Sequence, residues 1–319
     1  MTLATDHSTK GVRVPSTFST LRRFGLPGAL ATVFVACGTP ETPGTDTNGA
    51  WNRAPVEGGE LEYTVRGDGE PVLLSHGSHV ADAFLPLTGE PALDDYQLIN
   101  YHRRGFAGSA AHDGPFSIAD QAADALAMLR HLGVSRAHVV GHSYGGATAL
   151  QIAHDAPEVV YSLSLLEPAL LMVPSAEGVN EALGPSFERY ESGDAAGAVE
   201  AFMQVIGGSE WRSQAARTVP GGAEQAEEDA ATWFEVEAPA LGEWQFDADA
   251  AGEISAPILY VLGSESGPFF VEGRDLVLTW FPQAEDEVIE GANHLLQIQE
   301  PRAVAEAIAD FLAEHPMEM

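Results

Sequence analysis

A candidate nucleophile lies in segment 141–145, whose sequence Gly-His-Ser-Tyr-Gly has the pattern G-x-S-x-G. An apolar run precedes this segment and a run of small and apolar residues follows it, which favours a tight turn between a strand and a helix. Glycines on both sides remove the Cβ atoms that would clash in such a turn, so the hydroxyl of Ser143 is pushed into open space. The pattern therefore predicts nucleophilic catalysis by Ser143. It also predicts that N–H groups at the start of the following helix stabilise negative charge nearby.

The elements that position this serine are short apolar runs bounded by turn residues. They lie at 61–66, 72–75, 97–101, 138–141, 162–166, 258–262 and 287–289. Continuous apolarity is typical of strands buried on both faces, and the helical patterns between the runs indicate crossovers. We therefore expect an α/β fold with a mostly parallel central sheet and flanking helices. The first two runs are close enough to form an antiparallel hairpin through Gly67-Asp68-Gly69.

Residues 168–255 interrupt this alternation, because they are rich in Ala, Glu and Gly and contain helical patterns without a convincing strand. We interpret this segment as an inserted helical cap. The core is then expected to comprise residues 55–167 and 256–319.

By its motifs the chain resembles the α/β-hydrolase family. His76-Gly77-Ser78 follows an apolar strand, segment 104–109 (Arg-Gly-Phe-Ala-Gly-Ser) follows the next, and the serine turn and segment 291–294 (Gly-Ala-Asn-His) come after them in the family's order. The resemblance implies that His294 is the base. It further implies that the backbone N–H groups of Ser78 and Tyr144 form an oxyanion hole, which would stabilise charge present only in the transition state.

In this family an acidic residue completes a catalytic triad with the serine and the histidine. Its commonest place is an Asp on the loop after the strand that corresponds to 258–262, and this chain departs from that pattern. Here that loop has the sequence Gly-Ser-Glu-Ser, so Glu265 is one candidate. The other candidate is Glu167, at the end of the strand after the nucleophile, a placement that also occurs in the family. We favour Glu167, because a carboxylate directly after a buried strand is costly unless it is paired, and a histidine would pair with it. Without such a role, Glu167 would be a carboxylate that anchors the cap and Glu265 an exposed loop residue.

The resemblance implies a cofactor-free serine hydrolase that cleaves an ester-like bond of a small or medium acyl substrate. Two alternatives use the same triad, namely a C–C bond hydrolase and a cofactor-free perhydrolase. A hypothesis of another class is a non-catalytic binding lipoprotein on a hydrolase fold, suggested by the missing loop Asp. An Asp nucleophile, as in the epoxide hydrolases and haloalkane dehalogenases of the family, is excluded by Ser143.

The first residues are typical of an export signal. A basic stretch is followed by the apolar run 24–36, which is shorter than the roughly 20 residues that span a bilayer, and then by Cys37. The run ends in a sequence similar to a bacterial lipobox. We therefore expect a signal peptide at 1–36, lipid attachment at Cys37, a flexible Gly/Pro/Thr-rich tether at 37–54, and a location in the bacterial cell envelope. The alternative is a cytoplasmic enzyme with an over-extended gene start.

Composition limits the partners of the chain. The 319 residues carry a formal charge of -32 and one lysine, Lys10, so no basic patch is available to bind nucleic acid. The expected partner is a small-molecule substrate, with membrane contact only through the lipid on Cys37. No Cys/His cluster has the spacing of metal ligands, and neither a metal nor an organic cofactor is expected.

Overall fold

The computed structural model describes residues 50–317. The predicted signal at 1–36, the lipid attachment at Cys37 and most of the predicted tether lie outside these residues. Strand β1 (Asn52–Val56) begins inside the range 37–54 that we predicted for the tether, so the folded core starts earlier than expected. Its sequence contains a proline and only one fully buried side chain, Ala54, and so lacks the apolar run by which the other strands were predicted.

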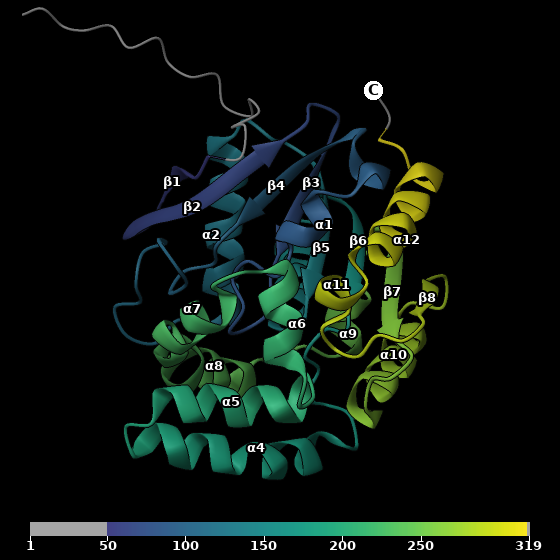
Figure 1. Cartoon of the computed structure of the whole chain (residues 1–319). Helices are drawn as coiled ribbons and strands as arrows, with labels where there is room; N and C mark the ends of the chain where they lie inside the picture. The colour runs from purple at the N-terminus through teal and green to yellow at the C-terminus, as the bar shows by residue number, and fades with distance from the viewer. Residues whose placement is uncertain (1–49, 318–319) are drawn as a thin grey trace, which may run out of the picture. The chain divides into compact units, whose positions relative to one another are not determined.

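The fold is built on one eight-stranded sheet with the order β1-β2-β4-β3-β5-β6-β7-β8 (Figure 1). The strands after β1 are β2 (Gly59–Arg66), β3 (Glu70–Ser75), β4 (Tyr96–Tyr101), β5 (Ala137–His142), β6 (Val160–Leu166), β7 (Ile258–Gly263) and β8 (Glu285–Ile289). All neighbouring pairs from β4 to β8 are parallel, and β2 runs opposite to the strands on both of its sides. The predicted α/β fold with a mostly parallel sheet is confirmed.

The expected hairpin between the first two apolar runs is wrong. Strand β4 lies between β2 and β3, and it pairs antiparallel with the former and parallel with the latter. The glycines between the two runs are needed because the backbone before β4 passes very close to them. A Cβ on Gly67 would lie 2.2 Å from the carbonyl oxygen of Tyr96, and one on Gly69 would lie 1.8 Å from that of Asp95. These glycines therefore allow the start of β4 to pass beside the turn.

Helices cover both faces of the sheet, and neighbouring residues of one strand alternate between two cores. Leu73 packs in a core with side chains of α2 (Ile118–His131), α3 (Tyr144–Asp155) and α10 (Pro268–Trp280). Leu74 packs in the opposite core with side chains of the remaining flanking elements. These are α1 (Leu85–Thr88), the 3₁₀ turn η1 (Pro91–Leu93), α11 (Leu296–Gln299) and α12 (Pro301–Glu314). Burial on both faces explains why the central strands β3 to β7 are largely apolar, whereas the edge strands β1 and β8 are mostly exposed.

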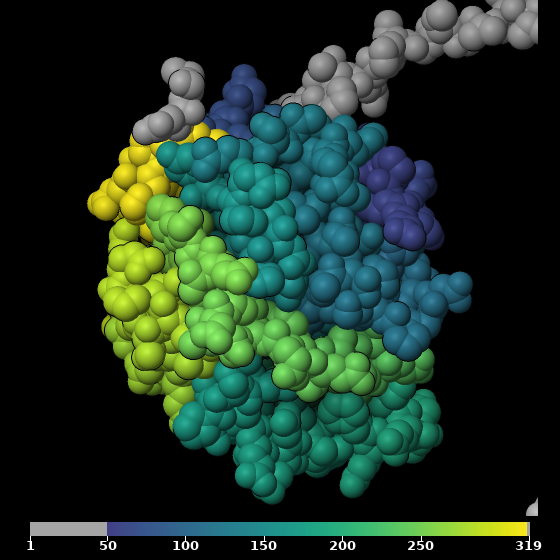
Figure 2. Space-filling view, turned by 180° about the vertical axis from the view of Figure 1, so that it is seen from behind, coloured from purple at the N-terminus to yellow at the C-terminus, as the bar shows by residue number. Residues whose placement is uncertain are grey.

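A group of helices connects β6 to β7, and all but the last of them lie beyond one end of the sheet (Figure 1). It comprises α4 (Ala176–Glu191), α5 (Ala195–Ile206), α6 (Trp211–Thr218), α7 (Gly222–Glu228), the π-helix η2 (Thr232–Glu237), α8 (Ala238–Glu243) and α9 (Ala248–Ala251). We call these helices the cap. Seen from behind, the cap and the sheet domain form one continuous surface (Figure 2). Among the described residues, no helix has the length and apolarity needed to cross a membrane.

Candidate active site

The turn at Ser143 has the geometry that its glycines predict. Ser143 lies between β5 and α3 with φ 54° and ψ -120°, a conformation that is unfavourable for a residue with a side chain. A Cβ on Gly141 would lie 2.4 Å from the oxygen of Gly145, and one on Gly145 would lie 2.1 Å from the oxygen of Ser75. Neither position tolerates a larger residue. The backbone N–H of Ser143 donates to the oxygen of Leu166 at 3.0 Å, which ties the turn to the end of β6.

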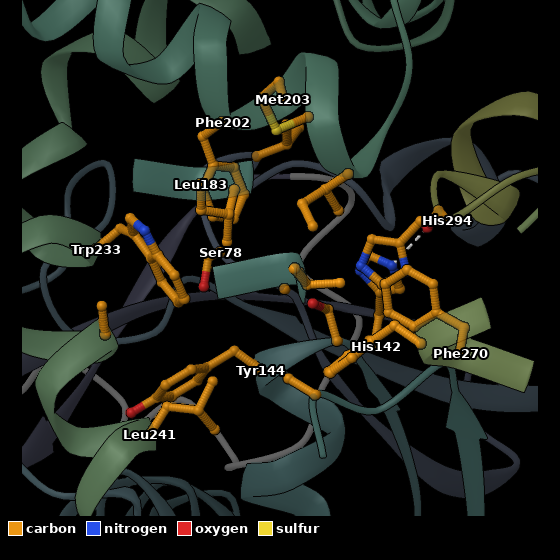
Figure 3. Close-up of a pocket in the computed structure, with 18 of the residues that line it drawn as sticks. Ser78, His142, Tyr144, Leu183, Phe202, Met203, Trp233, Leu241, Phe270 and His294 are labelled. Carbon is orange, nitrogen blue, oxygen red and sulfur yellow. Dashed lines mark hydrogen bonds between the residues drawn. The ribbon is translucent and has the colours of Figure 1, made fainter. Parts of the chain in front are cut away.

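Ser143 opens into a cavity of about 300 Å³ between the sheet domain and the cap (Figure 3). Most of the cavity wall is apolar, and the cap supplies much of it. The cap side chains that line it include Leu183, Phe187, Phe202, Met203, Trp233 and Leu241. The residues predicted to act with Ser143, namely Ser78, Tyr144 and His294, line the same cavity although they come from three separate loops of the chain.

Glu167 and His294 are brought together by the loops after β6 and β8. Nδ1 of His294 lies 2.7 Å from Oε2 of Glu167, and both side chains are almost completely buried. The other carboxylate oxygen accepts hydrogen bonds from the backbone N–H of Gly263, at 2.7 Å, and from the hydroxyl of Ser266. Glu167 itself has φ 46°, so its backbone is held in a rarely occupied conformation. With Nδ1 engaged, Nε2 is the histidine nitrogen left for Ser143.

The side chain of the alternative acid, Glu265, makes no hydrogen bond or ion pair with His294 in the described residues. Its side chain is exposed, and its backbone N–H donates to the oxygen of Ala292 at 2.9 Å. The end of β7 and the loop after it nevertheless take part in the site. The backbone N–H of Gly263, the last residue of β7, and the hydroxyl of Ser266 in the loop both donate to the carboxylate of Glu167. Sequence reasoning missed Ser266, whose only signal was its position in the loop that carries the acid in the commonest pattern.

The loop after β3 approaches Ser143 closely. A Cβ on Gly77 would lie 3.0 Å from Cβ of Ser143 and 2.7 Å from Nδ1 of His142, so only glycine fits there. Within residues 50–317, the backbone N–H groups of Ser78 and Tyr144 donate to no protein acceptor. Both remain available for an oxygen atom of a substrate beside Ser143.

Comparison with known proteins gives the family. A model of the alpha/beta hydrolase fold matches residues 71–301 of the chain. The protein belongs to the α/β hydrolase fold family. The predicted resemblance is thus confirmed.

The proteins similar to this chain are named for several different activities. Its sequence is 42% identical over 110 residues to a protein of Variovorax paradoxus (strain S110) named as a carbamate hydrolase, RutD, a match that covers 33% of this chain and 41% of that protein. The chain matches 41% and 40% of the length of the first two curated relatives. Among solved structures, it is similar to a thermophilic esterase from Thermogutta terrifontis, with a TM-score of 0.70 and 22% identity over 84% of this chain and 100% of the other. It is also similar to the enol-lactonase from Burkholderia xenovorans LB400, with a TM-score of 0.68 and 20% identity over 82% of this chain and 100% of the other.

Two further rings contact the imidazole of His294 in this α/β hydrolase. The ring of Phe270 stacks on it with centroids 3.9 Å apart, and the ring of His142 lies 4.6 Å away. Nε2 of His142 donates to the backbone oxygen of His294 at 2.8 Å, and Nδ1 of His142 accepts from the side-chain amide of Gln297 at 3.1 Å. His142 therefore lines the cavity and also holds the backbone of His294.

Burial sets the charge states of the pair. It lowers the pKa of His294 to about 3, so this imidazole is neutral at neutral pH and able to accept a proton. Burial also raises the pKa of Glu167 to about 7, while the hydrogen bonds from Ser266 and Gly263 act in the opposite direction. His294, Ser266 and Gly263 all point donors at this carboxyl group, so its ionised form satisfies every contact.

The described residues contain no group of three or more His, Cys, Asp or Glu side chains that could hold a metal ion. The polar residues that line the cavity are Ser143 and its neighbours His142 and Tyr144, Ser78 of the oxyanion loop (residues 76–78), His294, Asn180 and Gln297. The chemistry that this arrangement supports is proton transfer at Ser143 and stabilisation of a nearby oxyanion.

Proposed function

We propose that this protein is a serine hydrolase that cleaves an ester-like bond of a small or medium acyl substrate through an acyl-enzyme on Ser143. The observation that carries the proposal is the buried 2.7 Å contact between Glu167 and His294, because His294 lines the same cavity as Ser143. A buried carboxylate paired with a neutral histidine orients the base and stabilises its cationic form, which a packing role does not require.

In this mechanism Nε2 of His294 accepts the proton of Ser143 while its oxygen attacks the carbonyl carbon. The resulting oxyanion accepts hydrogen bonds from the backbone N–H groups of Ser78 and Tyr144. Protonated His294 then gives its proton to the leaving group. In the second half, His294 activates a water molecule that hydrolyses the acyl-enzyme. No hydrogen bond joins Ser143 to His294 in the part of the chain described, and catalytic hydrogen bonds of this kind often tighten only when substrate is bound.

The cavity favours an uncharged, apolar acyl group. No Lys or Arg is among the residues that line it, and the wall is formed largely by aliphatic and aromatic side chains. An acyl chain that bears a carboxylate would lose its hydration without gaining a cationic partner. A neutral acyl group would bury apolar surface at roughly 25 cal/mol per Å². The names of the similar proteins, esterase and lactonase among them, support an acyl carbon as the reacting centre.

A fluorophosphonate probe tests the proposal, because it forms a covalent adduct only with an activated serine. We expect the wild-type protein to be labelled and to hydrolyse p-nitrophenyl esters of acyl chains from acetate to decanoate. The matched Ser143→Ala variant should do neither. A wild-type protein that is not labelled and hydrolyses no ester in this series would contradict the proposed function.

We further propose that the protein is exported and held in the bacterial cell envelope by a lipid on Cys37. This proposal rests on the sequence of the first residues alone, which lie outside the described structure.

A further inference from the structure

One buried ion pair joins the cap to the sheet domain beside the active site. The guanidinium of Arg103, on the loop after β4, binds the carboxylate of Glu237, the last residue of the π-helix η2. Both side chains are completely buried. Short π-helical segments occur frequently at functional sites. No signal in the sequence linked these two residues, which are 134 positions apart.

Both members of the pair form hydrogen bonds with the oxyanion loop, residues 76–78. Arg103 donates from Nε to the backbone oxygen of His76 at 2.9 Å and from Nη2 to that of Gly77 at 3.0 Å. Glu237, which accepts from Arg103 with Oε1, accepts with Oε2 from the hydroxyl of Ser78 at 2.7 Å. Three consecutive residues of this loop are therefore fixed by one arginine of the core and one glutamate of the cap.

The same arginine also reaches the second oxyanion donor. Its guanidinium carbon lies 4.8 Å from the centre of the Tyr144 ring, a distance suited to a cation–π interaction. Ser78 and Tyr144 are the two residues whose backbone N–H groups we assign to the oxyanion hole. One ion pair therefore contacts both of them.

The backbone next to Ser78 is strained. His79 has φ 68°, and its buried ring has no hydrogen-bond partner on either nitrogen within the described residues. A bulky residue with positive φ costs of order 1–3 kcal/mol and persists only when its surroundings impose that conformation. The contacts of Glu237 and Arg103 on residues 76–78 supply this constraint directly before His79.

Docking of the cap does not by itself require Glu237. The hydroxyl of Thr232 donates to the oxygen of Gly105, and the carboxylate of Asp229 accepts from the N–H of Ala107 at 2.9 Å. These contacts attach the same part of the cap to the core without touching the oxyanion loop. A completely buried ion pair is also an expensive way to hold two surfaces together, since an apolar pair of similar volume often stabilises a fold as well or better.

We propose that Glu237 is a positioning residue that sets the geometry of the oxyanion hole from the cap. It acts through the hydroxyl of Ser78 and the guanidinium of Arg103. The cap is then part of the catalytic machinery as well as a wall of the acyl pocket. This inference rests on the proposed serine-hydrolase function.

The test is the full-length Glu237→Gln variant, assayed on the best p-nitrophenyl ester. Glutamine keeps the length of the side chain but cannot offer two charged acceptor oxygens to Arg103 and Ser78. We expect kcat to fall by about 10- to 100-fold with KM within about twofold of wild type, because an oxyanion donor that is displaced acts mainly on the transition state. The matched control is Glu235→Gln, on the same π-helix, where the carboxylate accepts from the hydroxyl of Tyr190 at 2.6 Å. This control should have wild-type kcat.

Two measurements separate positioning from stability. Titration of active sites with the fluorophosphonate probe normalises kcat to the folded fraction. Inhibition by a trifluoromethyl ketone, which adds to Ser143 and generates an oxyanion, should weaken by the same factor as kcat. The double variant Arg103→Met/Glu237→Met replaces the ion pair by apolar side chains and leaves no buried charge unpaired, although the backbone oxygens of His76 and Gly77 lose the donors of Arg103. It should recover part of the free energy of unfolding that Glu237→Gln loses, without recovering kcat.

The inference is overturned if Glu237→Gln has wild-type kcat per titrated site, or if the double variant recovers kcat together with stability. A Glu235→Gln variant that loses as much kcat as Glu237→Gln also overturns it. These outcomes require an active wild-type enzyme. They are therefore distinct from failure of the proposed function, in which the wild type itself neither reacts with the probe nor hydrolyses esters.

Discussion

Replacing Glu167 by glutamine should place the proton of His294 on the wrong nitrogen. In the wild type, the carboxylate accepts from Nδ1–H of His294 through one oxygen and from the backbone N–H of Gly263 through the other. A backbone N–H can only donate, so the amide oxygen of a glutamine must face Gly263. The NH₂ group then faces His294, and Nδ1 must accept. The imidazole is thereby held with its proton on Nε2, where it cannot receive the proton of Ser143.

The expected magnitude follows from this tautomer. In serine hydrolysis, loss of the acid with retained geometry lowers kcat by about 10⁴, or roughly 5 kcal/mol of transition-state stabilisation. The packing of the site should survive, because glutamine has the same shape and the contact with Gly263 is kept. We therefore expect a folded protein that reacts slowly with the fluorophosphonate probe but still reaches one label per molecule.

The assay is steady-state hydrolysis of a p-nitrophenyl ester, normalised by active-site titration. The matched control is Glu265→Gln, the same substitution on the exposed side chain of the neighbouring loop, which should retain wild-type kcat. If Glu167→Gln stays within tenfold of wild type, the argument from the tautomer is refuted. If Glu265→Gln is the variant that loses activity, the acid has been assigned to the wrong loop.

Two further predictions concern stability and location. Burial lowers the pKa of His79 to about 3, so below the ordinary value of 6.5 the unfolded chain binds a proton that the folded chain excludes, and stability falls as pH falls. As the pH falls from about 7.5 to about 5, this one group should lower the free energy of unfolding of the wild type by about 2 kcal/mol. Urea unfolding of His79→Asn over the same pH range should show a loss that is smaller than the wild-type loss by about 2 kcal/mol. An identical pH dependence in both proteins would count against the buried, neutral His79. Separately, Cys37→Ser should move the protein from the membrane fraction to the soluble fraction of the expressing bacteria, and unchanged fractionation would exclude lipid attachment at this residue.

The strands and the catalytic turn could be predicted because each depends on a short stretch of chain. Seven of the strands lie where the runs in the sequence predicted them. For β3 to β7 the reason is burial on both faces, which requires continuous apolarity, whereas β8 is largely exposed. The turn at Ser143 is equally local, because its glycines and the following small residues are needed wherever that conformation occurs. β1 could not be predicted in this way, since only Ala54 of its side chains is fully buried and its pairing with β2 relies on backbone hydrogen bonds.

The order of the strands and the partners of the loops were decided by tertiary structure. The glycines at 67 and 69 are equally suited to a hairpin turn and to the passage of another strand, and only the insertion of β4 distinguishes the two. For the acid, the sequence left Glu167 and Glu265 open. The fold places the end of β6 beside the loop that carries His294 and turns the side chain of Glu265 to solvent.

The family, the turn that carries the proposed nucleophile and the positions of most strands could thus be predicted from the sequence, because these follow from local backbone conformation and from the alternation of apolar segments. Only the tertiary structure decided that Glu167 lies against His294 and that Glu237 of the cap binds Arg103 and Ser78. Such pairs join residues more than a hundred positions apart. Their contact depends on how the sheet is ordered and how the cap docks, and no short segment of the chain carries that information.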